Sequence, residues 1–93
     1  MEVADKDIIE TLYMLYEQAM YFEAYKILRD DYLAEDAVQE AFLRLIRHRK
    51  KIADPKAPVT RRYVYKTLKS AALDIYRGRK KQRDNCCEFD DAI

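Results

Sequence analysis

Apolar residues recur with the 3.6-residue period of an α-helix in three stretches of the chain. The first stretch covers residues 5–29, the second about 32–49, and the third about 60–81. No segment alternates apolar and polar residues in the way a half-buried strand does. The pattern therefore predicts an all-α fold, a compact bundle of three principal helices with no sheet.

The same period indicates which side chains form the core. They lie on the apolar faces of the expected helices: Leu12, Leu15, Phe22, Val38, Phe42, Leu45, Val64, Leu68 and Ile75. Asp30 and Asp31 supply a break and an N-cap before the second helix, and Thr60 supplies an N-cap for the third. Pro55 and Pro58 mark an irregular loop between these two helices.

The expected third helix has two chemically different faces. Opposite its apolar stripe lie six residues, five of them cationic: Arg62, Lys66, Lys69, Leu73, Arg77 and Lys80. Cations at this spacing can follow a phosphate backbone, and Tyr63, Tyr65 and Tyr76 among them offer flat faces for stacked bases. A basic helix that only faces water is the alternative, because most charge runs are solvated.

Composition favours a charged partner, because the charges are segregated along the chain. The 93 residues have a net charge of only +1, yet residues 1–46 hold four bases against eleven acids. Residues 47–83 hold fourteen bases against two acids, and residues 84–93 add four acids. The basic half is typical of a nucleic-acid-binding protein, and the acidic half suggests a second, different partner.

Catalytic chemistry is not evident in the sequence. His48 is the only histidine, lies among cations and has no carboxylate or thiol near it in sequence. One glycine cannot build a glycine-rich phosphate loop, and the adjacent Cys86 and Cys87 have the wrong spacing for a zinc or redox motif. We therefore expect no enzyme, no cofactor, no metal and no small-molecule substrate.

The sequence also lacks the marks of a membrane or exported protein. No apolar run approaches the roughly 18–20 residues of a membrane span, and the N-terminus does not resemble a signal peptide. We therefore expect a cytoplasmic protein with no membrane span.

Two motifs, in order, resemble region 2 of bacterial sigma factors. The region 2.2 pattern is an acid pair, an apolar pair, Gln-Glu, an aromatic residue and Leu-Arg, here Glu35-Asp36, Ala37-Val38, Gln39-Glu40, Phe42 and Leu43-Arg44. Residues 63–77 resemble the joined regions 2.3 and 2.4, and Asp74 and Arg77 match the Asp-x-x-Arg ending. Residues 15–29 are similar to region 2.1, and the whole stretch resembles the extracytoplasmic-function class in particular.

The resemblance implies that residues 1–83 form a domain with two partners, core RNA polymerase and promoter DNA. The residues that would face the β′ clamp helices of polymerase are Asp36, Gln39, Glu40 and Leu43. Those that would bind and open the non-template strand of the −10 element are Arg61, Arg62, Tyr63, Lys66, Lys69, Ser70, Arg77 and Lys80. The loop that would hold a flipped-out base contains Lys51, Asp54, Lys56 and Val59. An anti-sigma protein that covers the same faces is implied as a further partner.

The chain departs from the family pattern at three points. Tyr63 stands where the family usually has Trp, and Ser70 stands where it usually has Asn. Because a single hydroxyl cannot make the two-bonded base contact of an amide, the promoter sequence stays open. Sigma factors also continue into region 4, which is absent here, so we expect a truncated product or one domain of a longer protein. Residues 84–93 would then be an acidic tail or the start of an inter-domain linker.

Two other functions fit the same features. A free-standing DNA- or RNA-binding bundle would bind nucleic acid and ignore polymerase. A protein-interaction domain would use the face of Asp36 and Glu40 and show no salt-dependent binding of nucleic acid. Leu43, ringed by polar residues, fits either a docking patch or ordinary solvent exposure.

Overall fold

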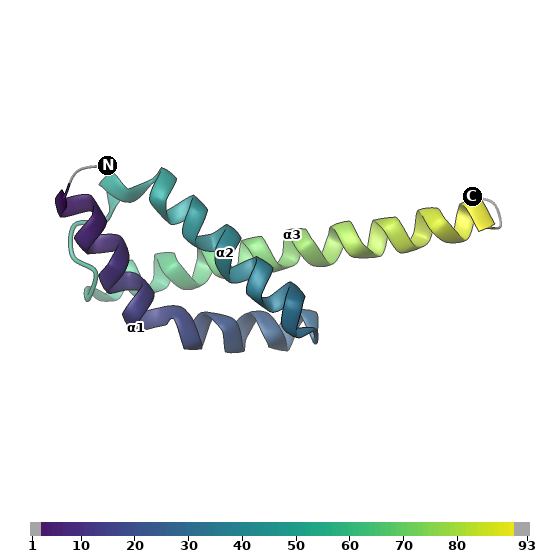
Figure 1. Cartoon of the computed structure of the whole chain (residues 1–93), viewed down its shortest axis with the longest axis horizontal. Coiled ribbons are helices and arrows are strands. Elements are labelled where there is room, and N and C mark those ends of the chain that lie inside the picture. Colours follow the sequence, from purple (N-terminus) through teal and green to yellow (C-terminus); the bar gives the residue numbers. More distant parts are fainter. Residues whose placement is uncertain (1–2, 91–93) are drawn as a thin grey trace.

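The computed structural model describes residues 3–90 and the side chains of residues 7–78. It contains three α-helices, α1 (Val3–Leu28), α2 (Asp31–Arg47) and α3 (Pro58–Asp90), with a short 3₁₀ helix η1 (Arg49–Lys51) after α2. These residues include no strand, so the prediction of an all-α bundle of three principal helices is confirmed. α1 and α2 pack against the first half of α3, and the second half of α3 extends beyond them (Figure 1).

The break between α1 and α2 depends on two residues. Arg29 adopts a left-handed conformation, with φ of 54°, which ends α1. Asp30 is extended, and its carboxylate accepts a hydrogen bond of 2.9 Å from the Leu33 amide, so it caps α2. The expected break and N-cap at this position are therefore confirmed.

The core lies where the three helices meet. Its buried side chains are Leu12, Met20, Ala24, Ala34, Ala37, Val38, Ala41, Phe42, Leu45, Ile52, Val64, Leu68, Ala71 and Ala72. Six of the nine expected core residues are among them, and Ile75 is half-buried against the same cluster. The many alanines on α2 and α3 let these helices approach closely, since a methyl group is the smallest side chain that still buries apolar surface.

Two expected core residues on α1 are exposed instead. Leu15 is 46 % exposed and Phe22 is 64 % exposed, so this part of the prediction was wrong. The side of α1 that faces the core carries Leu12, Met20 and Ala24. Apolar and aromatic residues occur all around α1, so their spacing alone could not identify which side is buried.

The start of α3 also differs from the prediction. The helix begins at Pro58, where proline is favoured because the first helical amide needs no partner, and not at an N-cap at Thr60. Thr60 is 5 % exposed, and its hydroxyl donates a hydrogen bond of 2.6 Å to the Asp54 carbonyl. The threonine therefore closes the preceding loop instead of capping the helix.

α3 continues to Asp90, well past the expected end at about residue 81. Gly78 does not interrupt it, and residues 84–90, which we expected to be an irregular tail, are helical. An established helix adds each further residue at little cost, which accounts for the longer element. Residues 91–93 lie outside the described part of the chain. None of the described helices is long and apolar enough to cross a membrane.

Candidate nucleic-acid interface and docking groove

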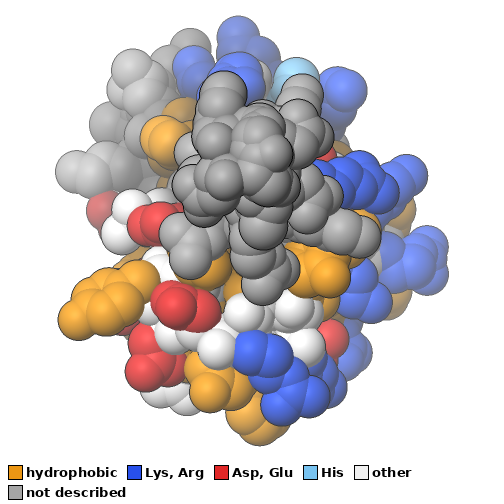
Figure 2. Space-filling model, turned by 90° about the vertical axis from the view of Figure 1, so that its right-hand side faces the viewer, with side chains coloured by type: hydrophobic (Ala, Val, Ile, Leu, Met, Phe, Trp, Pro, Cys, Tyr) orange, Lys and Arg blue, Asp and Glu red, His pale blue; other side chains and the backbone are white. Residues whose placement is uncertain are grey.

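A shallow groove of cationic side chains follows the first half of α3, and we call it the cationic groove. It is lined by Glu23, Lys56, Pro58, Arg61, Arg62, Tyr65, Lys66, Lys69, Ser70, Leu73, Asp74 and Arg77. Seen down α3, most Lys and Arg side chains gather on one side of the bundle, away from most of the acids (Figure 2). The structure therefore brings together six of the eight residues expected to bind DNA.

The other two of these eight residues lie elsewhere. The Tyr63 side chain is half-buried and packs against the core, and it does not line the cationic groove. The Lys80 side chain lies outside the described residues.

The aromatic surface in the cationic groove comes from Tyr65. The Arg61 guanidinium lies 5.8 Å from the centre of the Tyr65 ring, and the Tyr16 ring meets Tyr65 edge-on at 6.1 Å. Residues two apart on a helix point roughly 200° from each other, so Tyr63 and Tyr65 cannot serve the same face. The helical period of the cations could have selected Tyr65 from the sequence.

The loop before α3 is held in place from both sides. The Asp54 carboxylate accepts a hydrogen bond of 3.0 Å from the Lys56 amide, and the Tyr16 hydroxyl donates one of 3.3 Å to the Pro55 carbonyl. Together with the bond from Thr60 to the Asp54 carbonyl, these contacts join the loop to α1 and to α3. The side chain of Ile52 is buried in the core and anchors the start of the loop.

The four loop residues expected to hold a base are all exposed: Lys51, Asp54, Lys56 and Val59. Only Lys56 lines the cationic groove, and Val59, which is 63 % exposed, is the second residue of α3. No described pocket encloses all four, so a base held here would contact an open surface.

A second groove runs between α1 and α2, and we call it the apolar groove. It is lined by Ile9, Glu10, Tyr13, Met14, Glu17, Gln18, Ala19, Tyr21, Phe22, Glu35, Val38, Gln39, Phe42, Leu43 and Ile46. Met14 is 84 % exposed and Leu43 is 54 % exposed, so large apolar side chains from both helices face solvent here. The described lining includes three glutamates and no Lys or Arg, which makes the groove both apolar and acidic.

The four residues expected to face polymerase divide between two surfaces. Gln39 and Leu43 line the apolar groove, whereas Asp36 is exposed on α2 outside it. The Glu40 side chain instead accepts a hydrogen bond of 3.0 Å from Nε of Arg44.

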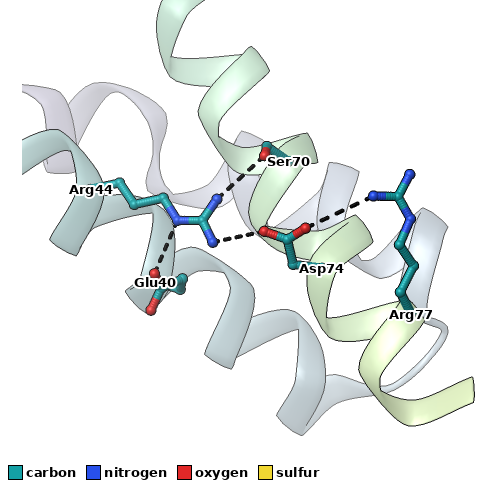
Figure 3. Close-up of polar contacts among 5 residues, drawn as sticks. All are labelled: Glu40, Arg44, Ser70, Asp74 and Arg77. Atoms are coloured by element: carbon teal, nitrogen blue, oxygen red, sulfur yellow. Dashed lines mark hydrogen bonds and ion pairs between the residues drawn. The ribbon is translucent and has the colours of Figure 1, made fainter. Parts of the chain in front are cut away.

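Arg44 links α2 to α3 by contacting Glu40 of its own helix and Ser70 and Asp74 of α3 (Figure 3). Besides its bond to Glu40, it donates through Nη2 to Asp74 at 2.9 Å and through Nη1 to the Ser70 hydroxyl at 3.3 Å. Arg77 lies 4.0 Å from the other oxygen of Asp74. The hydrogen bonds to Asp74 and Glu40 raise the pKa of Arg44 above its ordinary value, so the guanidinium stays charged.

Arg44 was not among the residues expected to form a site. Its signal in the sequence was the pairing of a Leu-Arg motif on one helix with an Asp-x-x-Arg motif on another, but only the fold shows that they meet. Among the described side chains, no cluster of His, Cys, Asp and Glu could hold a metal ion.

A helical bundle with a row of cations and an aromatic ring along one helix is typical of a nucleic-acid-binding protein. Comparison with protein families adds the particular family, because Sigma-70 region 2 matches residues 12–82. This match spans most of the chain, so the chain belongs to the Sigma-70 region 2 family. No curated protein and no solved structure matched the chain in the corresponding searches.

Family membership sets the general function. The chain is a sigma factor domain with a role in promoter recognition, and its partners are core RNA polymerase and promoter DNA. Region 2 is a transcription-initiation domain and not an enzyme, in agreement with the sequence.

Proposed function

We propose that this domain recognises and opens the promoter −10 element while it is docked on the β′ clamp helices of RNA polymerase. It would do so in the bacterial cytoplasm, as part of an alternative sigma factor of the extracytoplasmic-function class. The observation that carries the proposal is the cationic groove, with the half-buried Tyr65 among the cations that line it, on a chain of this family.

The DNA half of the proposal follows from the chemistry of the cationic groove. Lys66 and Lys69 lie about one turn apart along α3, so they can contact successive phosphates and release condensed counterions. An opened strand loses base stacking, and an aromatic ring can replace about 1–3 kcal/mol of it per base. We propose Tyr65, whose ring lies beside the Arg61 guanidinium, as the source of this surface.

The loop extends the same surface beyond the N-terminal end of α3. Lys56 lines the cationic groove, and the bond from Tyr16 to the Pro55 carbonyl supports the backbone beside it. A flipped-out base would then lie against an ordered loop, with Lys51, Asp54 and Val59 exposed around it. Because the loop is already held in place, little conformational entropy would be lost when DNA binds.

The polymerase half of the proposal uses the apolar groove. An amphipathic helix fits a groove between two helices by inserting apolar anchors, and a basic partner suits its glutamate rim. Leu43 and Gln39 would contact the β′ clamp helices, together with Met14 from α1. An anti-sigma protein would act by covering both grooves, which makes it a competitor of polymerase and DNA.

Salt-dependent binding of single-stranded DNA tests the DNA half. We expect Lys66→Ala/Lys69→Ala to weaken binding of a −10 oligonucleotide and to reduce the slope of log affinity against log salt by about 0.7 per lost phosphate contact. Arg47→Ala is the matched control, because Arg47 is exposed on α2 outside both grooves and should leave the slope nearly unchanged. An unchanged slope in the double variant would reject the cationic groove as the DNA site.

A free-standing nucleic-acid-binding bundle is the second candidate, favoured by the cationic groove alone. It would bind duplex DNA at least as well as single strands. The same titration with a duplex of the same sequence therefore separates the two candidates.

A further inference from the structure

Ser70 is exposed in the cationic groove, where it has a single hydroxyl with which to contact DNA. That hydroxyl is not isolated, because Nη1 of Arg44 donates to its oxygen at 3.3 Å. A guanidinium has only donors, so in this pair Ser70 can only be the acceptor. No acceptor among the described residues takes the hydroxyl hydrogen of Ser70, so that hydrogen is left to be donated elsewhere.

The position of Arg44 is set by its other two partners. Nε donates to Glu40 and Nη2 donates to Asp74, at 3.0 and 2.9 Å. These contacts use two different nitrogens of the planar guanidinium, so rotation of the group would break at least one charge-assisted bond. Nη1 is therefore kept beside the Ser70 oxygen (Figure 3).

We propose that Arg44 is a positioning residue that makes Ser70 a hydrogen-bond donor toward DNA, so that Ser70 selects a base with an exocyclic keto oxygen. Guanine O6 and thymine O4 accept such a bond, whereas adenine and cytosine present an amino group at the same position, which cannot accept it and could bond only to the remaining lone pair of the hydroxyl oxygen. The inference rests on the proposed function, since it requires that the cationic groove binds promoter bases. It adds a base preference and a residue outside the groove that sets it.

Base preference is the measurement that distinguishes positioning from general stability. A −10 oligonucleotide is synthesised with each of the four bases at each position, and binding to the whole chain is followed by fluorescence anisotropy. We expect one position at which guanine and thymine are preferred over adenine and cytosine by about two- to tenfold, the size of one hydrogen bond. Ser70→Ala should remove this preference and leave the preferences at the other positions unchanged.

Variants of Arg44 should change the same position. Arg44→Gln removes the guanidinium that contacts Ser70, so it should reduce the preference for guanine and thymine at that position. In the double variant with Ser70→Ala it should cause no further change. Arg44→Lys should behave in the same way, because one ammonium group cannot hold three partners in the fork geometry. Arg47→Gln removes the same charge from the same helix and should leave the base profile unchanged.

The results of these binding experiments test the base preference of Ser70 separately from the proposed function. Salt-dependent binding with a flat profile in the wild type, or a profile that Ser70→Ala leaves intact, would overturn the inference and leave the proposed function standing. No binding of single-stranded DNA by the wild type would overturn both. Helical content by circular dichroism checks each fold, and if Arg44→Gln is unfolded, Ser70→Ala and Arg44→Lys still decide the result.

Discussion

The buried hydroxyl of Thr60 shows how a single residue holds the DNA-facing loop. It is 5 % exposed and donates to the Asp54 carbonyl at 2.6 Å, which fixes the loop one turn before the cations of α3 begin. Arg44 acts further along the same helix, where it holds Ser70 and Asp74. At this scale the site depends on a few hydrogen bonds, and those of Arg44 join residues 26 and 30 positions apart in sequence.

Replacing the Thr60 hydroxyl should destabilise the protein. Thr60→Val keeps the shape of the side chain but removes one of the two hydrogen bonds that the Asp54 carbonyl accepts, the other coming from the Ala57 amide. We therefore expect a loss of about 0.5–1.5 kcal/mol in the free energy of unfolding. Urea denaturation followed by circular dichroism measures this loss. Thr67→Val, a half-buried threonine of the same helix, is the matched control and should cost less. Equal losses for the two variants would contradict this role of Thr60.

Tyr21 should make stability depend on pH in the alkaline range. Its hydroxyl donates to Asp31 at 2.5 Å, and this hydrogen bond raises the pKa of Tyr21 to about 12 from its ordinary value of 10.0. The folded state therefore holds the proton more tightly than the unfolded state. The stabilisation is complete below pH 10.0 and is lost as the pH rises toward about 12.

Alkaline titration of the variants checks this prediction. In Tyr21→Phe the fall in unfolding free energy across this pH range should be shallower, and ultraviolet absorbance should lack the tyrosine that ionises last. Tyr32→Phe removes a tyrosine that is 81 % exposed and should leave the pH dependence as in the wild type. The same pH dependence in both variants would contradict the assignment to Tyr21.

At the scale of elements, α1 is the helix whose buried side could not be predicted from the sequence. The existence and order of the three helices followed from apolar periodicity, and α2 and α3 buried Phe42 and Leu68 as expected. α1 is apolar on most of its circumference, so Leu15 and Phe22 could be judged only once α2 and α3 were packed against one side. Of these two residues, Phe22 lines the apolar groove and Leu15 does not.

Two methionines of α1 test this division of the helix. Met20 is fully buried, so Met20→Ala should lower the free energy of unfolding by about 2–5 kcal/mol through lost packing and a cavity. Met14 is 84 % exposed, so Met14→Ala should change it by less than about 0.5 kcal/mol. Denaturant unfolding of the two variants provides the comparison. A larger loss for Met14→Ala would mean that α1 packs with its other side inward.

The whole molecule separates two charged surfaces that the sequence had already separated along the chain. The basic half of the sequence forms the cationic groove on α3, and the acidic half contributes the glutamates of the apolar groove between α1 and α2. The sequence predicted the sign of each surface and most residues of the cationic groove. It could not predict that Met14 joins Leu43, or that Lys56 joins α3, because those neighbours meet only through packing.

Binding to purified β′ clamp helices is the most direct test of the central claim, that one bundle docks on polymerase and reads the −10 element. We expect Gln39→Ala/Leu43→Ala to weaken clamp binding by at least about tenfold, as truncation of an interface anchor does, with single-stranded DNA binding unchanged. Lys66→Ala/Lys69→Ala is the reciprocal control and should keep clamp binding while it loses DNA. A wild-type chain that binds DNA but not the clamp helices would contradict the account and favour a free-standing nucleic-acid-binding bundle.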